Sequence, residues 1–358
     1  MKYTSFFLLI ASLAHAAVDG TVVNGTTGKP QPAATVTLFQ TTQQGPQNLG
    51  SVKSDAQGKF TFPQDVRPGA GGGGPLLLQA VYAGVQYNLI ITPGSPQSGV
   101  SIPVYEATKS PGEAKITRHF FVLEPSPDGT MQVSEGFLYQ NDGKTTWNDP
   151  DRGTLQFELP PAAQGKVEVN VVAPGGLPIR RAPDALGKPN QYKLDFPIKP
   201  GETRVDLSWN MPFRSPGNFE DHMLSKAGVI QLVAPPGVDI KGPDVTLLGQ
   251  EPTTKSNIFG VKGPDVQIRV EGTGLFNTPS DSDNSGGGGG NLAENFPKLY
   301  SLLPANATFW DSVLAVKWVL LSILGMLALG FVLLYRKGDP LAASDPATKA
   351  STHARGRG

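Results

Sequence analysis

The chain has no cysteine, only four histidines and a formal net charge of zero. Without cysteine it can form no disulfide, and no acylated cysteine can follow a leader, so a lipoprotein anchor is excluded. The balanced charge offers no basic surface for nucleic acid, which is therefore not expected as a partner. Exported domains without disulfides depend on their hydrophobic cores, and this favours sizeable domains of a bacterial envelope protein.

The scarcity of histidine also bears on catalysis. His119, in the run ITRHFFVLEP, is expected to be half-buried in a strand, and His222 has no second nitrogen or sulfur ligand nearby in the sequence. A catalytic zinc needs three protein ligands, usually including histidines. The chain also lacks a Gly-x-Ser-x-Gly nucleophile elbow and a phosphate-binding loop. We therefore predict no enzyme, no catalytic residue and no cofactor.

Glycine (43) and proline (33) are abundant, whereas charged residues make up only 17%. Glycine and proline, together with Asn and Asp, separate short runs of alternating apolar and polar residues, which is typical of strands joined by tight turns. This pattern predicts an all-β protein of tandem antiparallel β-sandwiches. The first spans residues 17–109 and the second 112–274, where one domain or two remain open.

The segment SDAQGKFTF, residues 54–62, shows how such turns are built. Asp55 is expected to bind backbone N–H groups two residues on, and Gly58 to adopt a positive φ. Phe60 and Phe62 should share the buried face of the following strand, with Lys59 in water. We interpret the segment as a β-hairpin and not as a ligand-binding loop.

Residues 18–107 resemble the carboxypeptidase regulatory-like domain, a transthyretin-like sandwich. The matching residues are Gly20, Val22, Asn24, Gly28, Pro30, Ala34, Val36 and Leu38, followed by Ser54, Asp55, Gly58, Phe60 and Phe62. The insertion GAGGGG at 69–74 and a longer stretch between Gln40 and Ser51 depart from the family pattern. The resemblance implies a non-catalytic sandwich, since the zinc of such carboxypeptidases lies in a separate domain.

Both ends of the chain carry membrane signals. Residues 1–16 combine Lys2, an apolar core and a small-residue cleavage site, which predicts a secretory signal peptide. Residues 312–335 form a long apolar run bracketed by aromatic residues and followed by Arg336 and Lys337, which predicts one transmembrane helix. Between them, 275–311 is a Gly-rich linker with a juxtamembrane segment, and 336–358 is expected to be a disordered tail.

The signal peptide and the basic tail set the expected orientation. The positive-inside rule places the tail in the cytoplasm and the bulk of the chain outside it. We therefore expect a single-pass cytoplasmic membrane protein with a periplasmic or extracellular ectodomain. The motif KGPDV, at 241–245 and again at 262–266, is interpreted as two equivalent turns that enter two strands of one sheet.

One loop offers a candidate metal site. Asp142, Asn148, Asp149 and Asp151 crowd the segment 141–152, and calcium prefers six to eight such oxygen ligands. Two hypotheses follow. The first is a non-enzymatic accessory or scaffold subunit that binds envelope or membrane proteins, or a polymer, through its sandwiches. The alternative is a glycan-binding or calcium-dependent surface protein that uses the 141–152 loop.

Overall fold

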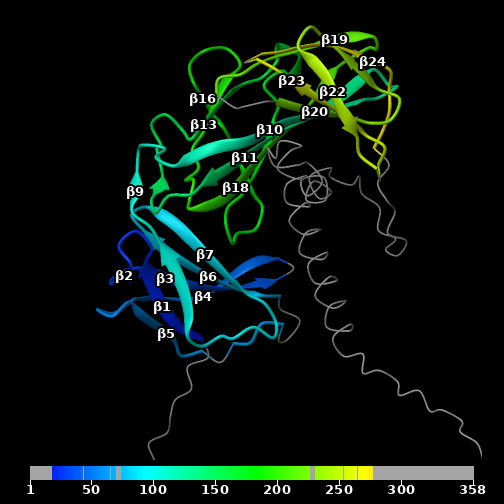
Figure 1. Cartoon of the computed structure of the whole chain (residues 1–358). Helices are drawn as coiled ribbons and strands as arrows, with labels where there is room; N and C mark the ends of the chain where they lie inside the picture. The colour runs from blue at the N-terminus through cyan, green and yellow to red at the C-terminus, as the bar shows by residue number, and fades with distance from the viewer. Residues whose placement is uncertain are drawn as a thin grey trace, which may run out of the picture. The chain divides into compact units, whose positions relative to one another are not determined.

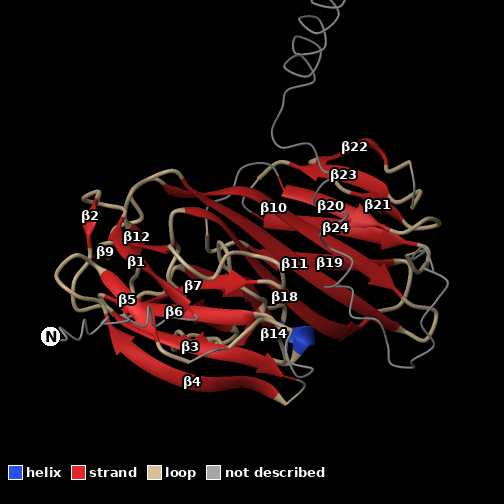
Figure 2. Ribbon diagram, turned by 90° about the horizontal axis from the view of Figure 1, so that it is seen from below, coloured by secondary structure: helices blue, strands red, loops and turns tan. Residues whose placement is uncertain are grey.

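The computed structural model describes residues 18–276 except 43, 65, 70–73, 226–229, 253 and 264. These residues form strands and loops with one short 3-10 turn, η2 (Pro161–Ala163), and contain no α-helix (Figures 1 and 2). The all-β class predicted from the sequence is therefore confirmed for this part of the chain. The signal peptide, the transmembrane helix, the tail and nearly all of the linker lie outside the described residues. No helix able to cross a membrane is found among the residues that are described.

The first sandwich packs two four-stranded sheets face to face. One sheet is built on β1, which pairs with β2 and β5 antiparallel and with β8 parallel, and the other runs in the order β4-β3-β6-β7. The strands are β1 (Val18–Asn24), β2 (Lys29–Pro30), β3 (Thr35–Thr42), β4 (Gly45–Lys53), β5 (Lys59–Phe62), β6 (Leu76–Tyr82), β7 (Val85–Ile91) and β8 (Val100–Val104). Alternate residues from both sheets form one continuous buried core.

The turn at residues 54–62 has the expected chemistry but a different partner. Asp55 Oδ1 accepts hydrogen bonds from the backbone of Gln57 (2.9 Å) and Lys59 (2.8 Å), and Gly58 has φ +72°. Phe60 and Phe62 are buried, as predicted. However, β4 pairs with β3 in one sheet and β5 with β1 in the other. The turn is thus a corner between two sheets, and the hairpin interpretation was wrong.

The second sandwich is organised around an eight-stranded sheet in the order β15-β14-β18-β11-β10-β20-β23-β22. Its neighbours are antiparallel except for β10 and β20, which run parallel. In chain order its strands are β10 (Ala114–Pro125), β11 (Thr130–Asn141), β14 (Glu168–Val172), β15 (Ile179–Arg181), β18 (Gly201–Pro212), β20 (Ile230–Ala234), β22 (Val245–Gln250) and β23 (Asn257–Val261).

Two three-stranded sheets pack against this large sheet. They are β13-β17-β16, from β13 (Leu155–Glu158), β16 (Asp184–Ala185) and β17 (Gln191–Leu194), and β19-β24-β21, from β19 (Gly217–His222), β21 (Asp239–Lys241) and β24 (Asp265–Glu271). All three sheets contribute to one hydrophobic cluster, so residues 114–270 share a single core. A short parallel pair, β9 (Ala107–Thr108) with β12 (Thr146–Trp147), links the end of the first sandwich to the second.

The two KGPDV segments are corners between sheets. The first leads from β21, in a three-stranded sheet, into β22 of the eight-stranded sheet. The second leads from β23 of the eight-stranded sheet into β24, which lies beside β21. The expectation that both motifs enter strands of one sheet was wrong. The two motifs connect the same pair of sheets in opposite directions.

Candidate functional site at an open sheet edge

Of the predicted calcium ligands, Asp142 follows β11 and the other three follow β12, and the Asp142 and Asp151 carboxylates each lie beside a basic side chain. Asp151 is paired with Lys109, whose hydrogen bond holds the pKa of Asp151 below its usual value. One carboxylate oxygen of Asp142 lies 3.5 Å from Lys115 Nζ. Ion pairs as exposed as these contribute little to stability, but they do place the carboxylates.

The other two candidates are held by backbone groups, of the same loop for Asp149 and of β9 for Asn148. Asp149 is buried, and its Oδ1 accepts a hydrogen bond of 3.2 Å from the backbone N–H of Arg152. Asn148 is anchored by its own N–H, which donates to the carbonyl of Thr108 at 2.8 Å. Among the described residues, no group of three or more His, Asp or Glu is placed to hold a metal. Calcium binding by this loop stays a prediction.

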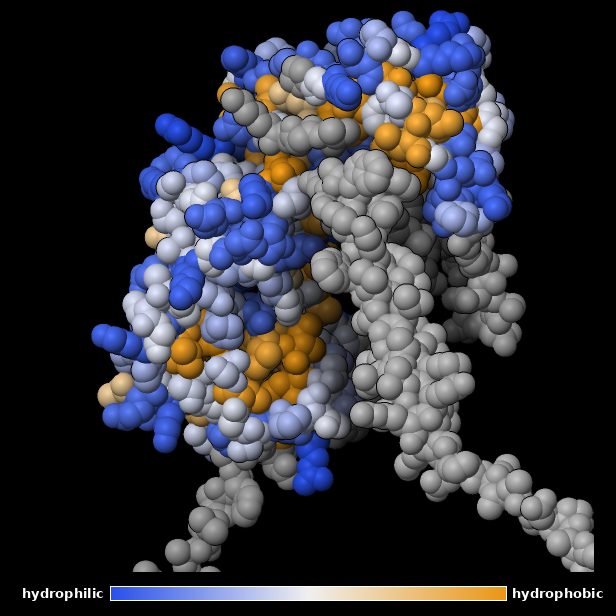
Figure 3. Space-filling view, in the orientation of Figure 1, coloured by the Kyte–Doolittle hydropathy of each residue, from blue (hydrophilic) through white to orange (hydrophobic). Residues whose placement is uncertain are grey.

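The most exposed strand edge of the second sandwich is β22. It is the last strand of the eight-stranded sheet and pairs only with β23, so its outer side is open within the described residues. Its sequence, VTLLGQ, contains no charge and no proline. Leu247 and Leu248 are 61% and 55% exposed, and Figure 3 shows hydrophobic surface over this part of the sheet.

Leu247 and Leu248 point to opposite faces of the sheet, as successive strand residues do, and the strand has a bulge between Leu247 and Gly249. Leu248 lies over Gly260 of β23, on one face of the sheet. Leu247 lines a groove of about 330 Å³ on the other face, where Phe259 and Ile240 form apolar walls. The edge therefore offers unpaired backbone groups beside a pocket wide enough for an apolar side chain.

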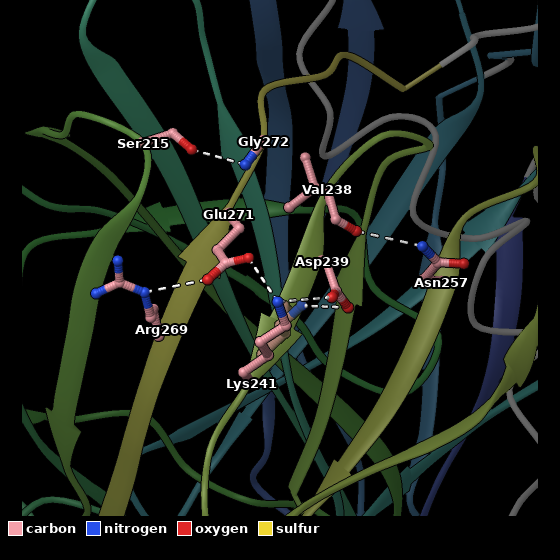
Figure 4. Close-up of polar contacts among 9 residues, drawn as sticks. Ser215, Val238, Asp239, Lys241, Asn257, Arg269, Glu271 and Gly272 are labelled. Carbon is pink, nitrogen blue, oxygen red and sulfur yellow. Dashed lines mark hydrogen bonds and ion pairs between the residues drawn. The ribbon is translucent and has the colours of Figure 1, made fainter.

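A network of ion pairs borders this groove (Figure 4). Lys241 Nζ lies 2.6 Å from Glu271 Oε2 and 3.6 Å from Asp239 Oδ2. Arg269 Nε reaches the other oxygen of Glu271 at 3.1 Å. These contacts raise the pKa of Lys241 and lower that of Glu271. The two basic and two acidic side chains neutralise one another, so the border of the groove has no net charge.

The opposite edge of the same sheet has a different character. There β15 presents Arg180 and Arg181, and Arg180 is paired with Glu168 at 3.0 Å. Charged residues on an edge strand discourage pairing with another chain. The edge strand β15 has charged side chains that discourage the addition of another strand, and β22 has none.

Comparisons with known proteins give no family. No family model and no curated protein matches the chain. An M1 zinc metallopeptidase from Deinococcus radiodurans is similar at 11% identity and a TM-score of 0.22, over 44% of this chain and 42% of that one. A variant of the shaft pilin SpaA from Lactobacillus rhamnosus GG is similar at 9% identity and a TM-score of 0.19, over 72% and 98%. The chain thus spans about two fifths of the peptidase, and scores this low define no shared fold.

The core also contains a polar cluster that the sequence analysis did not find. His119 on β10 is fully buried, not half-buried as expected, and its Nε2 lies 2.7 Å from Glu135 Oε1 on β11. Asp221 on β19 is buried nearby and lines the same small internal pocket as Glu135. Three atoms of the cluster have no hydrogen-bond partner among the described residues: His119 Nδ1, Glu135 Oε2 and Asp221 Oδ2.

Burial determines how this cluster is charged. It raises the pKa of Glu135 to about 8 and lowers that of His119 to about 3. It also raises the pKa of Asp221, to which the nearby Glu135 carboxyl adds. Burial therefore favours a protonated Glu135 beside a neutral His119. In that state the glutamate O–H can donate to the imidazole Nε2.

His222 is the other histidine of the described residues. It is exposed at the end of β19, and its Nδ1 is paired with Asp265 on β24. The β22 edge has a sign in the sequence: two adjacent leucines in a six-residue run bounded by turn residues. The sequence of β22 alone does not reveal that β22 is the edge strand of its sheet within the described residues.

Proposed function

We propose that this chain is a non-enzymatic, membrane-anchored envelope protein that binds a partner protein by accepting an extended segment along β22. The sequence supports the anchoring through the predicted signal peptide at 1–16 and the predicted transmembrane helix at 312–335. Its sandwiches would then lie outside the cytoplasm, periplasmic or extracellular, with the tail at 336–358 in the cytoplasm. The first sandwich is proposed to be carboxypeptidase regulatory-like, on the residues quoted above.

The observation that carries the proposal is the uncharged open edge with two exposed leucines. Sheet edges of this kind are normally protected by charge, proline or a covering loop, because unprotected edges pair with other chains. The outward bulge at Leu248 limits how far such pairing can extend. The occupant is therefore a short strand of a partner protein, with an apolar side chain placed in the groove beside Leu247.

The experiment purifies the full-length protein from its native membranes in mild detergent and identifies the proteins that accompany it by mass spectrometry. Leu247→Lys places a charge on the edge and into the groove, and we expect it to abolish a specific association. Leu177→Lys is the matched control, because Leu177 is 49% exposed outside β22. Hydrogen exchange on the isolated complex should show slower exchange of the β22 amides than in the free protein.

Three results would overturn the proposal. If the partner proteins still co-purify with the Leu247→Lys variant, they bind at a surface other than β22. Exchange at β22 that is unchanged by the partner shows that the edge stays open in the complex. A concentration-dependent dimer of the purified protein that Leu247→Lys abolishes would make the occupant a second copy of this chain.

The alternative, a glycan-binding surface protein using the 141–152 loop, has one observation in its favour. Asn148 and Pro150 of that loop line a second hollow of the molecule, which also contains a buried lysine. The hollow includes residues of β15, which lies at the opposite edge of the eight-stranded sheet from β22.

A further inference from the structure

A cleft of about 370 Å³ is lined by residues of both sandwiches. The first sandwich contributes the β6–β7 turn and the start of β7, including Gln86 and Asn88. The second contributes the 148–150 loop, the β14–β15 connection and the segment 195–199. Ligand sites of proteins are concave, of this size or larger, and carry a few polar groups among apolar walls.

The feature that distinguishes the cleft is Lys199, a lysine that is only 7% exposed. Its Nζ stands 5.3 Å from the ring centroid of Tyr87, and no carboxylate or hydrogen-bond acceptor among the described residues pairs with it. Buried lysines normally have such a partner, because desolvating an ammonium group is costly. Burial accordingly lowers the pKa of Lys199 to about 8.

The position of Lys199 is fixed by its surroundings. The neighbouring Ile198 exchanges two backbone hydrogen bonds with Trp147, at 3.0 and 2.9 Å. Tyr87, on which the ammonium rests, donates its hydroxyl hydrogen to the carbonyl of Tyr105 at 2.9 Å and therefore accepts from the Thr146 hydroxyl at 2.9 Å. The ammonium group is therefore held in place before any ligand binds.

Other lining residues complete the chemistry. Arg181 stacks over Phe196, with its guanidinium carbon 5.7 Å from the ring centroid, and has no carboxylate partner among the described residues. Asp195 is the one acidic residue of the lining, so two cations face one carboxylate. The side-chain amide of Asn88 uses its oxygen to accept from Gln79 at 3.2 Å, which leaves its NH₂ group to donate.

We propose that this cleft binds a carboxylated sugar unit, with the sugar carboxylate on the Lys199 ammonium and its hydroxyls against the amides of Asn88 and Asn148. An anion supplies the partner that Lys199 lacks, through a charge-assisted hydrogen bond. Amide groups both donate and accept, as sugar hydroxyls require. This site is independent of the β22 edge, so either proposal can fail without the other.

The test is isothermal titration calorimetry of the purified full-length protein with digalacturonic acid and with its methyl ester. The ester keeps the hydroxyls and removes the charge, so we expect it to bind at least tenfold more weakly than the acid. Lys199→Met keeps the aliphatic stem on Tyr87 and should weaken binding of the acid at least tenfold. Lys166→Met, at an exposed position, is its control.

A second pair of variants covers the case in which Lys199→Met fails to fold. Arg181→Gln removes the other cation of the cleft and should weaken the acid several-fold, whereas Arg180→Gln, on the same strand but paired with Glu168, should not. Equal affinity for acid and ester would refute the role of charge. Absence of binding by the wild-type protein, or binding of a tripeptide carboxylate in place of the sugar acid, would overturn the assigned ligand class.

Discussion

The buried pair of His119 and Glu135 predicts an unusual dependence of stability on pH. In the unfolded chain Glu135 ionises near its ordinary pKa of 4.5, whereas in the folded protein burial raises that pKa to about 8. Above about pH 4.5 the unfolded state therefore loses a proton that the folded state keeps. The contribution of Glu135 to the free energy of unfolding is complete below pH 4.5 and is lost progressively as the pH rises towards 8.

The magnitude follows from the two pKa values. Each unit of difference corresponds to about 1.4 kcal/mol. The full shift thus corresponds to about 5 kcal/mol of lost stability at pH 8, and the part reached at pH 7 to about 3 kcal/mol. Glu135→Gln removes the titrating group, and its amide N–H can still donate to His119 Nε2. The variant should therefore become more stable relative to the wild type as the pH rises.

His119 acts in the opposite direction at lower pH. Burial lowers the pKa of His119 from 6.5 to about 3 in the folded protein. Below about pH 6.5 the unfolded chain therefore binds a proton that the folded protein does not, and stability decreases as the pH falls. Between about pH 4.5 and 6.5 the two residues offset each other in the wild type. Loss of stability on raising the pH should then be visible in the wild type mainly between 6.5 and 8.

The assay is urea denaturation of wild type and Glu135→Gln at a series of pH values from 5 to 8. We expect the difference in unfolding free energy to increase by several kcal/mol across the series, in favour of the variant. Glu202→Gln, at an exposed position on the neighbouring β18, should show no such trend. A difference that does not change with pH would show that the folded protein does not keep a proton on Glu135 that the unfolded chain loses, and the reasoning would be refuted.

Two further predictions concern packing and metal binding. A Cβ at Gly136 would lie 2.0 Å from the buried ring of Phe120, so Gly136→Ala should destabilise the protein by about 2 kcal/mol in urea denaturation, and adding Phe120→Leu should recover part of the loss. Calcium at about 1 mM should leave the melting temperature unchanged, because Asp149 and Asp151 already bind the Arg152 backbone and Lys109. A rise of several degrees would favour the calcium-dependent alternative.

Local turn chemistry could be predicted from the sequence, because it depends on residues that are close in the chain. Asp55 and Gly58 form the predicted turn, and alternation places Phe60 and Phe62 in the core. The sheet that each strand joins depends on partners far away in sequence. For that reason the turn at 54–62 was taken for a hairpin, although it connects two sheets.

The same limit applies to the polar cluster. Alternation along MQVSEGFLYQN places Glu135 on the same face as Val133 and Phe137, so its burial was open to prediction. Its contact with His119 depends on the register between β10 and β11, in which Phe121 faces Glu135 and His119 faces Phe137. A shift of two residues would keep both side chains in the core, and it would set His119 directly opposite Glu135 or four residues away from it, according to its direction. No feature of either run alone fixes that register.

The strand order of the large sheet makes the two proposed sites separable. Arg181 of the cleft belongs to β15 and Leu247 to β22, and these are the two opposite edges of one eight-stranded sheet. The six strands between them bury side chains on the core face, where substitutions would disturb both sites through stability alone. Substitutions at the edges avoid that difficulty. Leu247→Lys should therefore leave the affinity for digalacturonic acid unchanged, and Arg181→Gln should leave the partner protein bound, because energetic effects at distant sites without shared contacts are independent.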